Sequence, residues 1–361
     1  MMPDGGERQA LGAMLRTRHT PSYSAHAFTT LTMRLLSAPS SALRSVRRRV
    51  GLGGRCSAIA FLLLTLQVPA AAQAQTTARP AASTAASTAP APFAVKVVGK
   101  GPPMLFIPGL TSGGAVWDDI VAAFADRYQC HVFTLAGFAG QPPIAADSTW
   151  LRRMRDAIVA YAKTEQLERP IVVGHSLGGF LALDIAAHEP ALPRAVVNVD
   201  GLPFLPATIS PDATLESVKP MVAQMRRAMT GGNPAQAAQA EQMQEMQLRS
   251  MVRDTSRLPM VRSMGRASDR ATVAEAMSAL YSVDLRPDLA RITAPVLNLH
   301  AWVAYRSYGQ TRPRMEQLLA NQYAALRTGT TRISDSAYHF IMLDEPAWLI
   351  SEMQGFLSAA R

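Results

Sequence analysis

Residues 171–180 read Ile171-Val-Val-Gly-His-Ser-Leu-Gly-Gly-Phe180, and this stretch decides the fold. It begins as the apolar, β-branched run of a buried strand and continues through residue 188 with a helical pattern. Between the two lies the G-x-S-x-G sequence of residues 174–178. In such a tight strand-to-helix turn, the two glycines leave room for a strained serine at the positive end of the helix. The pattern therefore predicts Ser176 as a nucleophile. The alternative is an idle serine in a glycine-rich turn.

Strand-like and helix-like segments alternate on both sides of this turn. The predicted strands are Phe93–Val98, Met104–Ile107, His131–Thr134, Ile171–Val173, Ala195–Val199, Val296–Leu299 and Thr330–Ile333. The predicted helices lie near 114–126, 149–166, 177–188, 313–326 and 346–359. Most strand runs are continuously apolar, which is typical of strands that are buried on both faces. The sequence therefore predicts an α/β fold with a mostly parallel sheet and helices on both faces.

One segment, residues 203–283, departs from this alternation. It contains several helical patterns and no convincing strand, and it carries nine methionines. Ordinary helix packing explains most of the methionines, although methionine also forms adaptable apolar surfaces that suit a substrate entrance. We interpret the segment as a helical cap inserted into the α/β domain.

The positive charge of the chain is concentrated at its N-terminus. Residues 1–74 hold nine arginines against two acidic residues, which accounts for +7 of the net charge of +10. The rest of the chain has 27 basic and 24 acidic side chains and no basic run interleaved with aromatic residues. The sequence therefore gives no indication of a nucleic-acid partner.

The same N-terminal region has the pattern of a secretory signal. An arginine-rich stretch over 44–55 precedes an apolar run over 58–66, and Ala70-Ala-Ala-Gln-Ala74 offers a cleavage site. We expect an exported protein, periplasmic or extracellular, cleaved after Ala74. The alternative is an uncleaved membrane anchor, but the run is shorter than the ~20 residues that span a bilayer. Translation from Met33 instead of Met1 would give a more ordinary signal.

The remaining chain divides into a spacer and one folded unit. Residues 75–92 are a low-complexity stretch rich in alanine, threonine and proline, which we interpret as a disordered linker. Residues 93–361 have the length of one α/β domain. After cleavage Cys130 is the one cysteine left, so no intramolecular disulfide can form, and its place in a strand predicts a buried thiol.

With these features, the sequence resembles the α/β-hydrolase superfamily over nearly all of 93–361. Besides the G-x-S-x-G turn, the stretch Met104-Leu-Phe-Ile-Pro-Gly-Leu-Thr-Ser-Gly-Gly-Ala-Val-Trp117 resembles the loop that forms the oxyanion hole in that family. The usual His-Gly is replaced by Pro108-Gly109. The resemblance implies that the backbone N–H groups of Leu110 and Leu177 bind the oxyanion. Such donors depend on backbone position, so the replacement need not abolish the hole.

A serine nucleophile needs a general base, and the resemblance implies His339. This residue lies in the loop between the last predicted strand and the last predicted helix, where the family places its base. His300, at the end of a strand, is interpreted as structural.

The acid departs from the pattern of many relatives. They carry an aspartate in a His-Gly-x-x-Asp sequence, where this chain has Ala304. Some branches of the family place the acid after the strand that follows the nucleophile helix, and here that position is Asp200. Active sites lie at the carboxyl ends of such strands. We expect Asp200 to orient His339; the alternatives are a turn role for Asp200, with Asp284, Asp335 or Asp344 as the acid.

The expected chemistry is hydrolysis of a carboxylic ester in a small acyl substrate, through an acyl-enzyme formed by Ser176, His339 and Asp200. Hydrolysis of an amide, a lactone or a C–C bond is the alternative within enzymes. A binding protein that has lost turnover is the alternative from another class. The sequence contains no metal-ligand cluster and no phosphate-binding glycine loop, so we expect no cofactor. The oligomeric state is left open.

Overall fold

The computed structural model of the chain describes residues 91–230 and 237–359, all of which belong to one unit, Gly54–Arg361. The predicted leader (1–74) and nearly all of the predicted linker (75–92) lie outside the described residues, so both stay predictions. Among the described residues, no helix is long and apolar enough to cross a membrane.

Seven strands form one sheet in the order β1-β3-β2-β4-β5-β6-β7. The strands are β1 (Phe93–Val98), β2 (Pro103–Ile107), β3 (Gln129–Leu135), β4 (Ile171–His175), β5 (Ala195–Val199), β6 (Val296–Ala301) and β7 (Gly329–Ser334). Every neighbouring pair is parallel except β1 and β3, which are antiparallel. The predicted α/β fold with a mostly parallel sheet is thus confirmed, with each strand within three residues of its predicted bounds.

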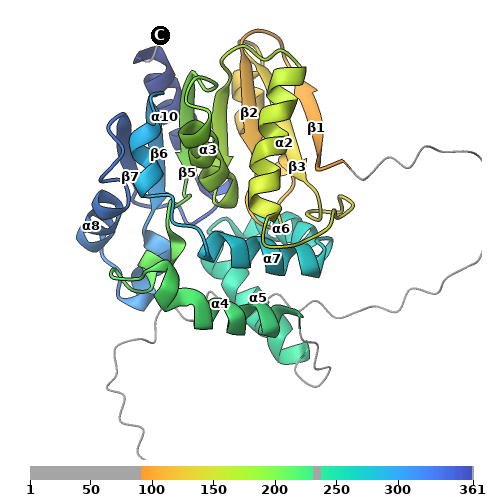
Figure 1. The fold of residues 1–361 in the computed structure, drawn as a ribbon, viewed down its shortest axis with the longest axis vertical. Coiled ribbons are helices and arrows are strands. Elements are labelled where there is room, and N and C mark those ends of the chain that lie inside the picture. Colours follow the sequence, from red (N-terminus) through yellow and green to blue (C-terminus); the bar gives the residue numbers. More distant parts are fainter. Residues whose placement is uncertain (1–90, 231–236, 360–361) are drawn as a thin grey trace, which may run out of the picture. The chain divides into compact units, whose positions relative to one another are not determined.

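Helices cover both faces of this sheet (Figure 1). The helical elements outside the predicted cap segment are η2 (Gly114–Trp117), α1 (Asp118–Phe124), α2 (Trp150–Thr164), α3 (Leu177–His188), η6 (Pro287–Arg291), η7 (Val303–Tyr308), α8 (Arg312–Gln322), α9 (Ile341–Asp344) and α10 (Pro346–Ala359). Successive residues of a strand point to opposite faces. Accordingly, Leu105 and Ile107 of β2 pack with α2 and α3, whereas Met104 and Phe106 pack with α1 and α10.

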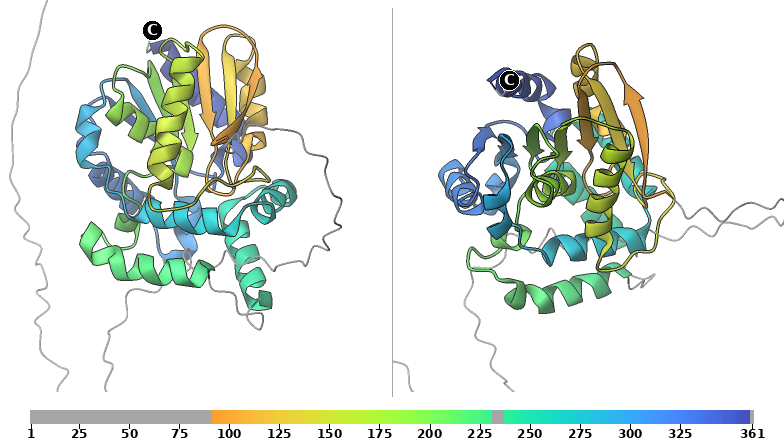
Figure 2. Two further views of the ribbon diagram at one scale, coloured as in Figure 1. Left: turned by 45° about the vertical axis from the view of Figure 1, so that its right-hand side comes forward. Right: turned by 45° about the horizontal axis from the view of Figure 1, so that its top comes forward.

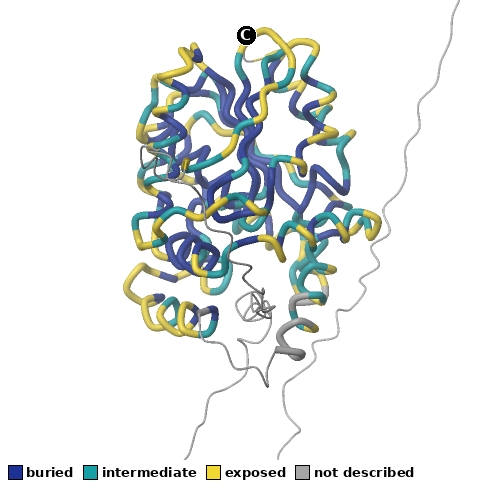
Figure 3. The backbone as a smooth tube through the Cα atoms, turned by 90° about the vertical axis from the view of Figure 1, so that its right-hand side faces the viewer, coloured by how far each residue is buried: buried dark blue, intermediate teal, exposed yellow. Residues whose placement is uncertain are grey.

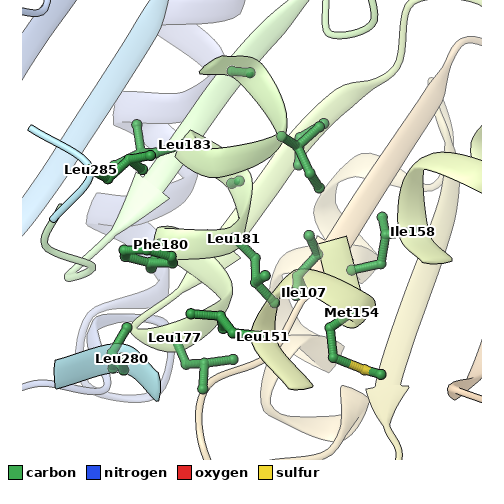
Figure 4. Packing of buried hydrophobic residues seen from close by; sticks show 14 of the residues in the cluster. Ile107, Leu151, Met154, Ile158, Leu177, Phe180, Leu181, Leu183, Leu280 and Leu285 are labelled. Carbon is green, nitrogen blue, oxygen red and sulfur yellow. The ribbon is translucent and has the colours of Figure 1, made fainter. Parts of the chain in front are cut away.

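Helix α3 is the most deeply buried helix of the site region. Residues 177–187 are all buried, and Figure 4 shows α3 side chains in one cluster with Leu151 of α2 and Leu280 of α7. Burying one leucine or phenylalanine side chain contributes about 1.5–3 kcal/mol relative to leaving it exposed. In Figure 3 the dark blue of buried residues is concentrated in the interior of the tube, and the exposed residues lie mainly at its periphery. The helix that follows Ser176 is therefore held firmly against the sheet.

The segment 203–283 is helical where it is described. It contains η3 (Leu205–Thr208), α4 (Leu215–Thr230), α5 (Ala237–Met251), η5 (Thr255–Arg257), α6 (Leu258–Arg266) and α7 (Arg270–Tyr281). Helices α4 to α7 form a layer across one end of the strands (Figures 1 and 2). The backbone N–H of Phe340 donates to Met251, and that of Asp269 donates to Gly137. Because Gly137 and Phe340 follow β3 and β7, this layer lies at the carboxyl ends of the strands.

Candidate active site

The turn between β4 and α3 holds Ser176 in a strained backbone conformation. Ser176 has φ 54° and ψ −116°, a region that residues other than glycine rarely adopt. The two flanking glycines explain why the chain can turn here. A Cβ at Gly174 would lie 2.0 Å from the carbonyl oxygen of Gly178, and a Cβ at Gly178 would lie 2.2 Å from that of Ile107. Backbone strain of this kind costs about 1–3 kcal/mol and is concentrated at functional sites.

The loop after β2 passes directly against this turn. A Cβ at Gly109 would lie 2.8 Å from Nδ1 of His175 and 3.2 Å from Cβ of Ser176, so only glycine fits there without displacement. Within the described part of the chain, the backbone N–H groups of Leu110 and Leu177 have no hydrogen-bond acceptor. Leu177 is the first residue of α3, where a backbone N–H has no partner within the helix. The two residues predicted for the oxyanion hole thus both have an unengaged donor beside Ser176.

Asp200 and His339 come from the ends of two different strands and meet. Asp200 directly follows β5, and His339 lies in the loop between β7 and α9. The Nδ1 atom of His339 is 2.7 Å from Oδ2 of Asp200, and the two side chains are 13% and 8% exposed. Asp200 has φ 52°, a second strained position among the residues predicted for the site. An ionised carboxylate only accepts hydrogen bonds, so the Nδ1–H of His339 donates, and in the neutral imidazole the lone pair is then on Nε2.

The other oxygen of Asp200 is also occupied. Its Oδ1 accepts from the backbone N–H of Ala301 at 3.0 Å and from Nδ1 of His300 at 3.2 Å. Burial alone would raise the pKa of the Asp200 carboxyl. The hydrogen bonds from His300 and His339 outweigh burial and hold this pKa well below its usual range. Asp200 is therefore an anion at neutral pH even though it is buried.

His175 is a buried neutral imidazole behind the serine. It is 1% exposed, and its Nε2–H donates to the carbonyl oxygen of His339 at 3.0 Å. Its ring centroid lies 4.6 Å from that of His339 and 4.8 Å from that of Phe340. Burial, followed by the proximity of His339, lowers the pKa of His175 to about 3. His175 thus fixes the backbone that carries His339 without adding a charge.

The alternative acids are engaged elsewhere. Asp344 accepts from the backbone N–H groups of Arg253, Asp254 and Tyr338. Asp335 is bound by the indole of Trp302 and the guanidinium of Arg312. Asp284 is bound by Arg286 at 2.6 Å. None of the three is hydrogen-bonded to His339, so of these four carboxylates only Asp200 is in contact with that histidine.

The contact between His300 and Asp200 was not foreseen from the sequence, which indicated a structural role for His300. A signal existed in the order of the strands. Strand β5 pairs with β6 in the register Val199↔Leu299, so the next residues along each strand, Asp200 and His300, are neighbours. Reading this register requires knowing that β5 and β6 are adjacent, which the sequence alone does not state.

Two further observations concern the described residues outside the hydrogen bonds of the site. Among the described residues, no group of three or more histidine, cysteine or acidic side chains could bind a metal ion. A cavity of about 590 Å³ is lined by residues of β7, α8 and α10, and none of Ser176, Asp200 and His339 lines it. The candidate active site is therefore defined by its hydrogen-bond geometry at the carboxyl ends of the strands.

Comparison with known proteins agrees with the fold and with the position of the turn. The sequence profile described as the alpha/beta hydrolase family matches residues 104–352, and the chain belongs to this family. The match includes the turn at Ser176, Asp200 and His339.

Its relatives include esterases. The pimeloyl-(acyl-carrier protein) methyl ester esterase of Aeromonas hydrophila is 33% identical over 109 residues, 30% of this chain and 41% of the relative. The enzyme of the same name from Vibrio cholerae is 26% identical over 210 residues, 57% of this chain and 77% of the relative. The chain thus spans less than half of the Aeromonas relative.

Among solved structures, the enol-lactonase from Burkholderia xenovorans LB400 is similar in fold. It has a TM-score of 0.58 and 18% identity, over 74% of this chain and 96% of that one. At this identity the likeness concerns the fold alone. Together the comparisons define the chain as an alpha/beta hydrolase with esterase and other hydrolase relatives.

Proposed function

We propose that this protein is a serine hydrolase that cleaves a carboxylic ester, with Ser176 as nucleophile, His339 as general base and Asp200 as the acid. The observation that carries the proposal is the 2.7 Å contact between His339 Nδ1 and Asp200 Oδ2, together with a serine held at φ 54° whose neighbour His175 bonds to the His339 backbone. Ser176 is half-buried, and a base oriented by a buried carboxylate, near such a strained serine, is the arrangement that activates the serine hydroxyl.

In the proposed mechanism, Asp200 holds His339 in the tautomer with hydrogen on Nδ1. The lone pair of Nε2 takes the proton of the Ser176 hydroxyl while the serine oxygen attacks the ester carbonyl. The carbonyl π electrons move to oxygen, and the backbone N–H groups of Leu110 and Leu177 stabilise that oxyanion. One such donor is worth about 10²–10³ in rate. When the C–O bond breaks, Nε2–H returns the proton to the leaving alkoxide.

Water completes the cycle. His339 takes a proton from water, the hydroxide oxygen attacks the acyl carbon, and collapse of the second tetrahedral intermediate releases the carboxylic acid. The proton on Nε2 then returns to Ser176. No cofactor is required at any step. In each of the two tetrahedral intermediates His339 is an imidazolium, and the Asp200 carboxylate stabilises it at short range.

An ester is the bond class best supported by the relatives. Those of Aeromonas and Vibrio are named for methyl ester hydrolysis. We therefore propose ester hydrolysis for this chain. Export remains part of the proposal and is supported by the signal pattern of residues 44–74. N-terminal sequencing of the exported protein should begin near Gln75, and retention of residues 56–74 would identify an anchor.

A fluorophosphonate probe tests the nucleophile. It should form a covalent adduct on Ser176, which mass spectrometry of the peptide locates, and Ser176→Ala should abolish labelling. Ser336→Ala is the matched control, because this serine lies three residues from His339 and bonds to Glu345 rather than to the proposed triad. Adduct formation that persists in Ser176→Ala would refute the assignment. A series of p-nitrophenyl esters of increasing acyl length would then define the substrate.

A further inference from the structure

The carboxylate of Asp200 is within hydrogen-bond distance of two imidazoles. Its Oδ2 faces His339, while its Oδ1 lies 3.2 Å from Nδ1 of His300. Because an ionised carboxylate has no hydrogen to give, the proton in the second contact must come from His300 Nδ1. His300 is 2% exposed, so water does not compete for this bond.

The other nitrogen of His300 is bound on the opposite side. Nε2 of His300 lies 3.0 Å from the hydroxyl of Tyr323, a residue at the end of α8. The Tyr323 hydroxyl lies 2.6 Å from the carbonyl oxygen of Gly201. The same hydroxyl accepts a hydrogen bond from Nδ2 of Asn198 at 2.8 Å. Gly201 directly follows Asp200, so the contacts form a closed ring around the end of β5.

The members of this ring are nearly inaccessible to water. Tyr323 is 7% exposed and Asn198 is fully buried. Hydrogen bonds in such a dry environment are strong and hold their partners in one geometry. With both nitrogens engaged, the ring of His300 cannot flip without breaking two buried hydrogen bonds. The Nδ1–H of His300 is thus aimed at Asp200 permanently.

Asp200 needs such support because its backbone, although its N–H donates to Leu299 at 2.7 Å, does not fix the plane of its carboxylate. It lies beyond the end of β5 at φ 52°, and a carboxylate bound at one oxygen can rotate about the bond that carries it. Bonds to Oδ1 from His300 and from the Ala301 N–H fix the plane of the carboxylate. Oδ2 is then left in line with His339.

We propose that His300 is a positioning residue of the active site, which fixes Asp200 through Nδ1 so that Asp200 in turn orients His339. This inference rests on the proposed function. It assigns to His300 a role that acts through Asp200, without contact with the substrate.

Two substitutions separate the nitrogens of His300. In His300→Asn the side-chain amide can occupy the position of Nδ1 and still donate to Asp200. In His300→Gln it can occupy the position of Nε2, which retains the Tyr323 contact and leaves Asp200 Oδ1 with the Ala301 N–H alone. Outer residues that orient an active-site group typically account for about 10- to 100-fold in activity. We expect kcat to fall by that factor in His300→Gln, with KM nearly unchanged, and by less than about 5-fold in His300→Asn.

Tyr323→Phe is the matched control for general damage to the buried ring. It removes the hydroxyl that contacts His300, Asn198 and Gly201 but leaves the His300–Asp200 bond in place. We expect a smaller loss of kcat than in His300→Gln, even where its thermal stability is lower. A loss equal to that of His300→Gln would mean that the whole ring acts structurally, which would overturn the proposal.

Two readouts separate positioning from structure. Without the His300 bond the pKa of Asp200 rises, because burial is then opposed by fewer donors, so an acid titration that follows the Asp200 carboxyl carbon by NMR should show protonation at higher pH in His300→Gln than in His300→Asn. The strongly deshielded proton resonance of the His339–Asp200 bond should persist in His300→Asn and broaden or vanish in His300→Gln.

The outcomes distinguish this proposal from the proposed function. Equal kcat, Asp200 titration and proton resonance in the two variants would refute positioning by His300, whereas Ser176 labelling would still support a serine hydrolase. An absence of labelling and ester turnover in the native protein would refute the proposed function. In that case the proton resonance alone still decides whether His300 sets the bond between Asp200 and His339.

Discussion

The two sides of the Ser176 turn are held by different kinds of contact. On the acid side, Asp200 is bound by buried side chains and backbone from the ends of the strands, at distances of 2.7–3.2 Å. On the donor side, the loop over 108–114 is held partly by α6 and the turn after it. The N–H of Gly113 is 3.4 Å from Sδ of Met264, and the hydroxyl of Ser268 is 3.4 Å from the carbonyl oxygen of Thr111.

The comparison separates the contacts at the strand ends, which hold Asp200, from the contacts of α6 and the turn after it, which help to hold the loop over 108–114. The acid side carries the charge, and a buried carboxylate needs short bonds to stay ionised. The donor side uses neutral backbone groups, for which longer and softer contacts suffice. Substitutions in α6 should therefore affect oxyanion binding before they affect Asp200, whereas α5 also contacts the base side, since the N–H of Phe340 donates to Met251. The predictions below test that division.

The largest expected effect is on the acid side. Asp200→Asn keeps the shape of the side chain but offers His339 Nδ1 either an amide N–H or a neutral oxygen, so the imidazole loses its fixed tautomer. In a well-studied serine protease the equivalent change lowers kcat by about 10⁴. We expect a loss approaching that size in steady-state ester hydrolysis, with an unchanged circular dichroism spectrum.

Asp335→Asn is the control for this experiment. Asp335 is 63% exposed on its side chain and is held by Trp302 and Arg312, so its loss should change kcat by less than about 3-fold, as is usual for exposed ion pairs. Near-normal turnover in Asp200→Asn with a collapse in Asp335→Asn would move the acid and contradict the proposed triad.

On the donor side, a single added methyl group should displace the loop that carries the Leu110 N–H. In Gly109→Ala the new Cβ would lie 2.8 Å from His175 Nδ1, so the loop must shift away from Ser176 and carry the Leu110 N–H with it. We expect kcat to fall by about 10²–10³, the usual cost of one oxyanion donor. Gly355→Ala on α10 has no atom within 4 Å of its Cβ and should retain full activity. Retention of activity in Gly109→Ala would show that this loop does not form the oxyanion hole.

The sheet could be predicted from the sequence because its strands are buried on both faces. Val172 and Val173 of β4 and Val196 and Val197 of β5 are fully buried, and such positions must be apolar without interruption. The turn at Ser176 could be predicted because its glycines face atoms at 2.0–2.2 Å and admit no other residue. Signals of this kind are local, and a single sequence contains them.

The support of the site could not be predicted because it depends on contacts between distant segments. Met264 is 151 residues from Gly113, and His300 is 100 residues from Asp200. Neither residue type indicates its partner: methionine is usually core, and a histidine at a strand end usually packs. The adjacency of β5 and β6 and the position of α6 decide these contacts, and both follow from the whole fold.

The third expected effect concerns His175, which touches both sides. Its Nδ1 lies 2.8 Å from the position that a Cβ on Gly109 would occupy, and its Nε2–H donates to the carbonyl oxygen of His339. Its pKa is lowered from 6.5 to about 3, so between these values the unfolded chain binds a proton that the folded protein does not. Stability is therefore lost as pH falls through this window, by about 1.4 kcal/mol per pH unit at most.

Urea unfolding at pH 7 and pH 5 measures this loss. We expect the free energy of unfolding of the native protein to fall by about 2 kcal/mol from this histidine between the two values. His175→Gln has no group that titrates there, so its stability should change less over the same interval, even if it is lower at pH 7. An identical change in both proteins would mean that His175 is not held neutral.

The smallest expected effect tests how firmly Met264 of α6 holds the loop over 108–114. In Met264→Leu the volume is nearly kept, but the sulfur that accepts from the Gly113 N–H is lost. A sulfur at 3.4 Å is a weak acceptor, so we expect kcat/KM to fall by less than about 10-fold, about 1.4 kcal/mol or less. The decrease should lie in kcat, because the oxyanion forms only in the transition state.

Met260→Leu on the same helix is the control, since Met260 packs against the apolar cluster and contacts no loop donor in the described chain. Equal kinetics in the two variants would show that α6 supports the loop by packing alone. A loss as large as that of Gly109→Ala would show instead that the donor side is as rigid as the acid side.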